Sequence, residues 1–187
     1  MKKNKKLGFL ELAKSRKTTY EFNDKGVKNN DIKKILEAGR WAPSCSNIQP
    51  WHFIVVKNKK RISEIMKTSY YGAFHTNSNV IIALVLKKNM SESEHRCIKN
   101  KKISFLEGNL CIAMAAMSMI FEAEDLGVDS CILSPEQKII SKILKIKEDC
   151  EIPLMLGVGY EKEGAYRKKR ERIDVNKLIS YEYYGGK

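Results

Sequence analysis

The stretch Ala42-Pro43-Ser44-Cys45-Ser46-Asn47-Ile48-Gln49-Pro50-Trp51 joins a predicted helix to a predicted strand. Its two prolines fix φ, and its hydroxyl and amide side chains carry more donors and acceptors than a turn of this length consumes. Such a segment can wrap a flat polar ligand, with Asn47 and Gln49 hydrogen-bonding a heteroaromatic edge. The alternative interpretation is an Asn/Ser-rich connecting turn that places Trp51 in the core.

Hydrophobic spacing on either side of this stretch predicts further helices and strands. Two short helices precede it, one ending near Arg16 and one that starts behind Asn30 or Asp31. A β-rich run at 51–56 follows it, then a short amphipathic helix at 61–66 and a continuous apolar strand at 80–86. The apolar strand implies a sheet that is buried on both faces.

The second half of the chain continues this alternation. A long helix is predicted over 103–126, with Gly127 closing it. Strands at 128–133 and 154–158 flank a helix that Ser134-Pro135-Glu136-Gln137 opens as a capping box, with Pro135 in the first helical position. The order of elements predicts one α+β domain over 1–187, with a sheet between helices.

Residues 161–187 depart from this pattern. A basic run at Arg167–Arg172 is followed by apolar spacing at Ile173, Val175, Leu178 and Ile179. An apolar tail behind a solvated loop has to dock on something, and the domain before it is already complete. We therefore expect 161–187 to form a basic loop and a C-terminal tail that docks on a partner subunit.

The chain of 187 residues carries 35 Lys and Arg against 22 Asp and Glu, a net charge of +13. Most of the basic residues are lysines. This fits a general bias in amino-acid composition better than a protein that has evolved to bind phosphates, which would use arginine. The basic run keeps nucleic-acid binding open as an alternative function. The even spread of the other basic residues, with no recognition motif and no interleaved aromatics, argues against that alternative.

The cysteines and the apolar stretches of the sequence indicate where in the cell the protein is expected. The five cysteines, at positions 45, 97, 111, 131 and 150, show no metal or redox spacing, and the three histidines are scattered. We therefore expect reduced thiols, no metal site and a cytoplasmic location. The apolar stretch Leu110–Phe121 is too short to span a bilayer, and the basic start Met1–Lys6 lacks the apolar segment of an export signal.

A second motif, Ser15-Arg16-Lys17-Thr18-Thr19, ends the first predicted helix. Two cationic side chains with several hydroxyls suit a phosphomonoester, which carries ~1.5 to 2 negative charges and three acceptor oxygens. The alternative is a solvated basic turn in a lysine-rich protein.

Together, Ser15–Phe22 and Ala42–Trp51 resemble two signatures of the nitroreductase family of FMN-dependent oxidoreductases. The second segment is similar to that family's A-P-S-x-x-N-x-Q-P-W stretch, and the resemblance extends over about residues 9–180. It implies an α+β fold with a central, mostly antiparallel sheet flanked by helices. It also implies an intertwined homodimer that exchanges C-terminal segments and binds FMN at the subunit interface.

The resemblance further implies which residues bind FMN. The phosphate and ribityl contacts would come from Arg16, Lys17, Thr18, Lys168 and Arg170. In the basic loop, Lys169 or Arg172 are alternatives for these contacts. Tyr20 stands where the family often has a basic residue. The flavin ring would be lined from the other subunit by Pro43, Ser44, Cys45, Asn47 and, less closely, Gln49. Leu133 and Ser134 would bring backbone groups to the reactive edge, because Pro135 has no N–H.

The implied chemistry belongs to the flavin, so no catalytic acid or base is expected among the side chains. NAD(P)H would reduce FMN, and a nitroaromatic, a quinone or a similar small acceptor would then take the electrons in a ping-pong reaction. Relatives on this fold that dehalogenate or consume their flavin remain an alternative. The variable segments 66–77 and 90–102 would build the acceptor pocket, with Tyr70, Tyr71 and Phe74 as lid aromatics.

Overall fold

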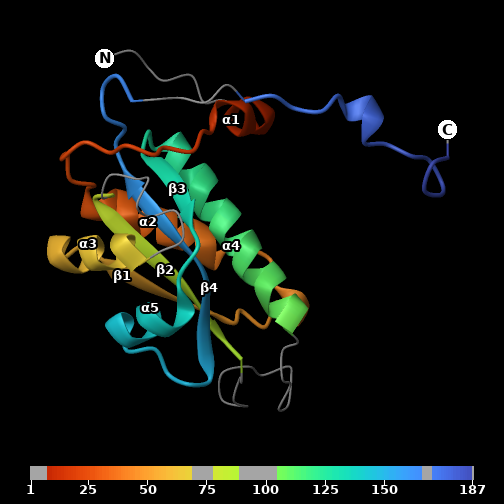
Figure 1. Cartoon of the computed structure of the whole chain (residues 1–187). Helices are drawn as coiled ribbons and strands as arrows, with labels where there is room; N and C mark the ends of the chain where they lie inside the picture. Colours follow the sequence, from red (N-terminus) through yellow and green to blue (C-terminus); the bar gives the residue numbers. More distant parts are fainter. Residues whose placement is uncertain (1–7, 69–77, 89–104, 166–169, 187) are drawn as a thin grey trace.

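A four-stranded sheet forms the centre of the computed structural model, which describes residues 8–68, 78–88, 105–165 and 170–186 (Figure 1). The strand order is β1-β2-β4-β3, and each neighbouring pair is antiparallel. The strands are β1 (Trp51–Val56), β2 (Val80–Lys87), β3 (Asp129–Leu133) and β4 (Cys150–Gly159). The predicted α+β class and antiparallel sheet are confirmed.

Strand β2 is buried along both faces from Val80 to Leu86. Its alternate side chains join two separate hydrophobic clusters, because successive residues of a strand point to opposite faces. One cluster takes Val80, Ile82, Leu84 and Leu86. The other takes Ile81, Ala83 and Val85. The continuous apolar run in the sequence thus reports a strand covered on two sides.

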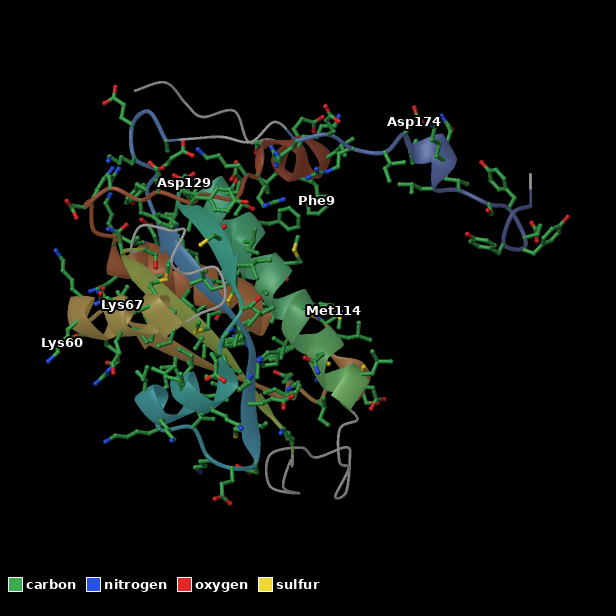
Figure 2. All side chains as sticks on the ribbon, in the orientation of Figure 1. Phe9, Lys60, Lys67, Met114, Asp129 and Asp174 are labelled. Atoms are coloured by element: carbon green, nitrogen blue, oxygen red, sulfur yellow. The ribbon has the colours of Figure 1, made fainter. Side chains whose placement is uncertain are left out.

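Two pairs of helices cover the two faces of the sheet (Figure 1). Helices α2 (Asn29–Arg40) and α4 (Phe105–Asp125) share the first cluster, whereas α3 (Lys59–Thr68) and α5 (Gln137–Leu144) share the second. The short α1 (Phe9–Ser15) lies outside this sandwich on α4, where the Phe9 and Phe121 rings meet edge to face at 5.0 Å between centroids (Figure 2). The part of the chain that the structure describes also has two 3-10 turns, η1 (Cys45–Asn47) and η3 (Val175–Lys177).

Helix α4 corresponds to the helix predicted over 103–126, and it extends beyond the apolar stretch Leu110–Phe121 at both ends. By length and composition alone, Leu106–Asp125 would be able to cross a membrane. Its buried residues Cys111, Ile112, Ala115, Ala116, Met119, Ile120 and Ala123 instead belong to the core between α2 and the sheet. This packing is typical of the central helix of a globular domain, which passes the same test of length and composition.

The end of α4 agrees with the prediction from the sequence, whereas the start of α5 differs from it. Gly127 has a φ of +67° after α4, as expected of a residue that closes a helix. The predicted capping box is wrong, because α5 starts at Gln137 with Glu136 as its N-cap. The Glu136 carboxylate accepts a hydrogen bond from the Ile139 N–H at 2.7 Å, so Ser134 and Pro135 lie before the helix.

Residues 16–27 run across one end of the sheet and tie the strand ends together. The Thr19 N–H donates to the Ser130 carbonyl at 3.0 Å, and the Asn23 N–H donates to the Tyr160 carbonyl at 2.8 Å. The Asn79 side-chain amide donates to the Asn23 carbonyl at 2.9 Å, which adds β2 to the same set. This crossing segment includes Arg16–Thr19 of the second motif, so the sheet end fixes the position of these residues.

The C-terminal tail extends away from the rest of the chain (Figure 1). The apolar positions that the sequence singled out are exposed there, Leu178 by 66%. The exposed large side chains of the tail are Ile173, Val175, Leu178, Ile179, Tyr181, Tyr183 and Tyr184. The tail therefore does not add to the core of its own chain.

Gly159 at the end of β4 permits the close approach of the crossing segment. A Cβ at this position would come within 2.7 Å of Phe22 Cδ1 and closer still to Asn79 Oδ1. We expect Gly159→Ala to lower the free energy of unfolding by about 1–3 kcal/mol, the usual cost of overpacking. Urea unfolding measures the change, and Gly26→Ala is the control because a Cβ there meets nothing within 4 Å. Equal stabilities of the two variants would contradict this packing argument.

Candidate functional site

Three arginines converge at the C-terminal end of α1. Arg16 follows the last residue of this helix, and the Arg170 guanidinium donates to the backbone carbonyls of Arg16 and, at 3.0 Å, of Lys14. The pKa of Arg16 is lowered by burial and by the positive charges of Arg170 and Arg172. We call these three residues the arginine cluster. Such mutual repulsion is relieved when an anion binds between the guanidinium groups.

Thr18 adds a hydroxyl beside the arginine cluster. Its Oγ1 lies 3.4 Å from Arg16 Nη1, and its backbone forms a parallel bridge with Ser130 at the start of β3. The next residue, Thr19, is fully buried, and its Oγ1 has no hydrogen-bond partner. Of the two threonines, Thr18 is thus exposed and Thr19 buried, while the exposed Ser15 hydroxyl donates to the Leu12 carbonyl at 3.0 Å.

Lys17 has different partners from those the resemblance implied. Its Nζ lies 2.7 Å from a Glu161 carboxylate oxygen and 3.2 Å from Asp129 Oδ1. Asp129 is the first residue of β3 and is labelled in Figure 2. The Asp129 carboxylate also accepts the Glu161 N–H at 2.8 Å. The ammonium therefore joins the ends of β3 and β4, and the phosphate contact expected of Lys17 stays a prediction.

The loop at residues 43–49 is held in an uncommon backbone conformation. Ser46, Asn47 and Gln49 have φ values of +50°, +54° and +48°. Residues other than glycine seldom adopt this left-handed backbone conformation. The Ser44 hydroxyl accepts the Gln49 N–H at 3.0 Å, and the buried Ile48 fastens the loop to the core. A loop constrained in this way presents a fixed surface to a ligand.

The side chains of this loop are only partly used within it. Gln49 Nε2 lies 3.3 Å from Asn47 Oδ1, whereas the Cys45 N–H donates to Cys111 Sγ on α4. Pro43, Ser46 and Asn47 are exposed, and Ser44 and Cys45 are partly buried. The exposed proline and amide are the groups that the sequence assigned to a flat ligand.

The arginine cluster and the loop at 43–49 lie at opposite ends of the sheet (Figure 1). The loop leads into Trp51, which pairs with Leu86, whereas Thr18 contacts Ser130 at the end where Val158 pairs with Val80. The span of β2 from residue 80 to residue 86 is about 20 Å at the usual rise per residue. One chain thus does not bring its two motifs together.

The remaining expected site residues lie in several places. The Leu133 side chain is buried in the core, so only its backbone can face a ligand, whereas Ser134 and Tyr20 are exposed. Lys168 lies outside the described residues, as do Lys169, Tyr70, Tyr71, Phe74 and the segment 90–102. Among the described residues, no group of three or more His, Cys, Asp or Glu side chains is placed to bind a metal.

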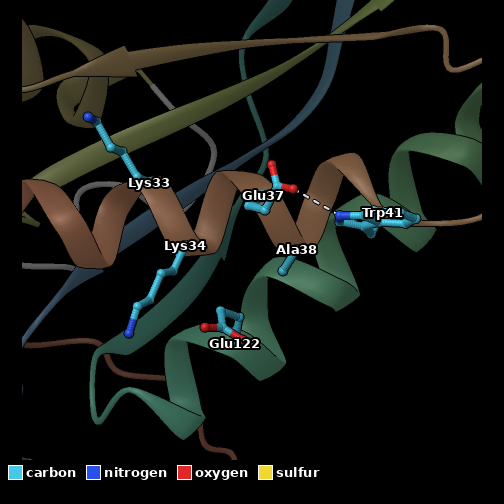
Figure 3. A pocket seen from close by; sticks show the side chains of 6 residues that line it. All are labelled: Lys33, Lys34, Glu37, Ala38, Trp41 and Glu122. Atoms are coloured by element: carbon cyan, nitrogen blue, oxygen red, sulfur yellow. Dashed lines mark hydrogen bonds between the residues drawn. The ribbon is translucent and has the colours of Figure 1, made fainter.

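A surface groove of about 540 Å³ between α2 and α4 was not predicted (Figure 3). Its lining residues are Lys33, Lys34, Glu37, Ala38, Trp41 and Glu122. The Glu37 carboxylate accepts the Trp41 indole N–H at 2.8 Å and pairs with Arg40, and these hydrogen bonds lower the pKa of Glu37 to about 2. The spacing of Glu37, Arg40 and Trp41 on one helix face is the signal that could have indicated this arrangement.

Comparison with known proteins places this geometry in a family. The nitroreductase family model matches residues 13–160. A candidate NAD(P)H nitroreductase of Staphylococcus epidermidis is 28% identical over 204 residues, covering 85% of this chain and 90% of that protein. The crystal structure of a nitroreductase family protein from Streptococcus pneumoniae has a TM-score of 0.77 at 25% identity, covering 92% of this chain and 99% of that one. An FMN-dependent nitroreductase from Clostridium difficile has a TM-score of 0.74 at 20% identity, covering 94% and 99%.

The fold and the two motifs define the class of an FMN-using oxidoreductase. The chain belongs to the nitroreductase family, whose members depend on NAD(P)H and use FMN. The resemblance seen in Ser15–Phe22 and Ala42–Trp51 is confirmed.

The Lys17 ion pairs predict a measurable role in stability. We expect Lys17→Gln to lower the free energy of unfolding by about 1–2 kcal/mol, since it leaves two largely buried carboxylates without their cation. Lys88→Gln is the matched control, because Lys88 forms a 2.9 Å pair with Glu151 but is 46% exposed, so we expect a loss below about 0.5 kcal/mol. Chemical denaturation compares the two, and a Lys17 loss no larger than the control would contradict the structural role.

Proposed function

We propose that this chain binds the phosphate of FMN at the arginine cluster and the Thr18 hydroxyl. The observation that carries the proposal is the convergence of Arg16, Arg170 and Arg172, in which the pKa of Arg16 is lowered by burial and by its two cationic neighbours. A phosphomonoester brings up to two negative charges and three acceptor oxygens, so it offsets this repulsion and accepts their hydrogen bonds. Lys168 in the basic run is a further proposed contact.

We also propose that the ring of FMN is lined by the partner's loop at residues 43–49. The separation of the two motifs along β2 supports this proposal, because a single chain offers only half of the site. Pro43, Ser44, Cys45 and Asn47 would line the ring from one subunit, with Gln49 close by. Leu133 and Ser134 of the other subunit would offer backbone groups, and Tyr20 would lie beside the phosphate motif.

In this proposal, the residues of the chain bind and orient, whereas the cofactor supplies the redox chemistry. Bound FMN would supply the transfer of hydride from NAD(P)H and of electrons to a nitroaromatic, a quinone or a similar small acceptor, in a ping-pong reaction. The guanidinium groups fix the phosphate end, and the constrained loop fixes the ring end. No side chain is required as an acid or a base, and we propose a cytoplasmic location for the reaction.

A homodimer follows from the same proposal, and the exposed apolar surface supports it. Phe9 and Leu10 on α1, Leu106 and Leu110 on α4, and the tail side chains are all at least 44% exposed. A monomeric soluble protein seldom leaves this many large apolar side chains in water. We propose that the tail of each subunit, within residues 161–187, covers part of this surface on its partner.

Replacing Arg16 tests the phosphate site. We expect Arg16→Gln to weaken FMN binding by roughly tenfold to a hundredfold, which corresponds to about 1.5–3 kcal/mol for a hydrogen bond to a charged group. Titration of the flavin-free protein with FMN, followed by flavin fluorescence, measures the affinity. Arg61→Gln is the control, since Arg61 is an exposed arginine on α3. An FMN affinity that is the same in both variants would remove Arg16 from the site.

Replacing Leu178 tests the tail. We expect Leu178→Glu to shift the protein from dimer to monomer, because docking would bury a carboxylate at an apolar contact at a cost of several kcal/mol. Sedimentation velocity over a range of concentrations reports the assembly. Asn30→Glu adds the same charge at an exposed position of α2 and should stay dimeric. A wild-type monomer, or a Leu178→Glu dimer of unchanged strength, argues against tail exchange.

A further inference from the structure

Two cysteines that are 66 residues apart in the sequence lie next to each other in the structure. The Cys45 N–H donates to Cys111 Sγ at 3.4 Å, which joins η1 to the middle of the sandwich through α4. The Cys45 thiol also lies near enough to the Cys111 thiol to be one of the causes that raise the pKa of Cys111. Sequence spacing does not indicate this pair, because its members belong to no short motif.

The distances are within reach of a disulfide bond. An N–Cα bond is ~1.46 Å long, so the Cα of Cys45 lies within about 5 Å of Cys111 Sγ. Rotation of the Cys45 side chain about its Cα–Cβ bond moves its sulfur while both Cβ atoms stay in place, so it can bring the two sulfur atoms toward the ~2.05 Å of an S–S bond. The η1 turn and α4 already hold a backbone atom of one cysteine in contact with the sulfur of the other.

The two thiols differ in their access to solvent. Cys111 is fully buried, and burial is the main cause that raises the pKa of its thiol. Cys45 is partly exposed on the loop at residues 43–49, so a small oxidant reaches Cys45 first. A reachable thiol beside a protected one is the arrangement of a reacting and a resolving cysteine.

The other described cysteines lack this combination. Cys131 is buried, and burial raises the pKa of its thiol to about 12. Cys150 is partly exposed, but its sulfur contacts the neighbouring Asp149 carboxylate at 3.5 Å rather than a second thiol. Cys150 thus provides a natural comparison for Cys45.

We infer that Cys45 and Cys111 form a redox-active pair that closes to a disulfide when hydrogen peroxide reaches Cys45. The Cys45 sulfur attacks one peroxide oxygen, the O–O bond breaks, water leaves, and Cys45 becomes a sulfenic acid. The Cys111 sulfur then attacks the Cys45 sulfur, the S–O bond breaks, and a second water carries away the Cys111 proton and the hydroxyl. Two thiols and one peroxide give one disulfide and two waters, and a small dithiol reduces the disulfide back to two thiols while it becomes a disulfide itself.

The disulfide would tie the loop at residues 43–49 to α4 by a covalent bond. This loop is the ring side of the proposed flavin site, so the link to cofactor binding rests on the proposed function. Bound FMN covers Cys45 in that arrangement and shields it from peroxide. We therefore expect saturating FMN to slow formation of the disulfide by tenfold or more.

Peptide mapping of the full-length protein tests the pair directly. After treatment with hydrogen peroxide and alkylation of the remaining thiols, we expect a Cys45–Cys111 cross-linked peptide that dithiothreitol removes. Cys45→Ser and Cys111→Ala should both abolish the cross-link, whereas Cys150→Ser should leave it unchanged. In Cys111→Ala, Cys45 should advance to the sulfinic acid, since nothing resolves it. Over-oxidised Cys45 without a cross-link in the wild type, or a cross-link to another cysteine in its place, would overturn the inference.

The same experiment with and without FMN separates this inference from the proposed function. A disulfide that forms at equal rates in the presence of FMN, in a protein that shows no flavin binding, supports the pair and contradicts the flavin site. Flavin binding without any disulfide supports the site and overturns the pair. Protection of Cys45 by FMN supports both.

Discussion

Burial of β2 on both faces is the constraint on which the rest of the structure depends. Each side chain from Val80 to Leu86 needs an apolar neighbour, so one helix pair must cover each face. The helices α2 and α4 fill one side, and α3 and α5 fill the other. With both faces of the sheet covered, the ends of the strands are where a ligand can reach it. Both candidate motifs lie at those ends.

The two ends of the sheet carry different physical properties. At one end, the crossing segment 16–27 gathers positive charge from α1 and from the basic loop, balanced in part by the Lys17 ion pairs with Asp129 and Glu161. At the other end, a loop with three left-handed residues presents an exposed proline and amide groups. A charged phosphate suits the first end, and a flat polar ring suits the second. In the proposed homodimer, two such unlike surfaces meet across the interface.

The sequence predicted most of the fold because local patterns determine it. The strand 51–56 matches the structure residue for residue, and the apolar run at 80–86 identified the central strand. The partners of Lys17 could not be predicted, since Glu161 lies 144 residues away and pairs with it only through the sheet. The same holds for Cys45 and Cys111. The start of α5 was misplaced because Glu136 competes as a cap with Ser134, and spacing alone does not choose between them.

The separation of the two motifs has a genetic consequence. In the proposed two-fold assembly, each FMN site takes its arginine cluster from one subunit and its loop from the other. A subunit damaged at Arg16 and a subunit damaged at Asn47 would then combine into a mixed dimer with one doubly damaged site and one intact site. Two inactive alleles could thus complement each other within a single assembly, whereas two lesions at the same end of the sheet could not.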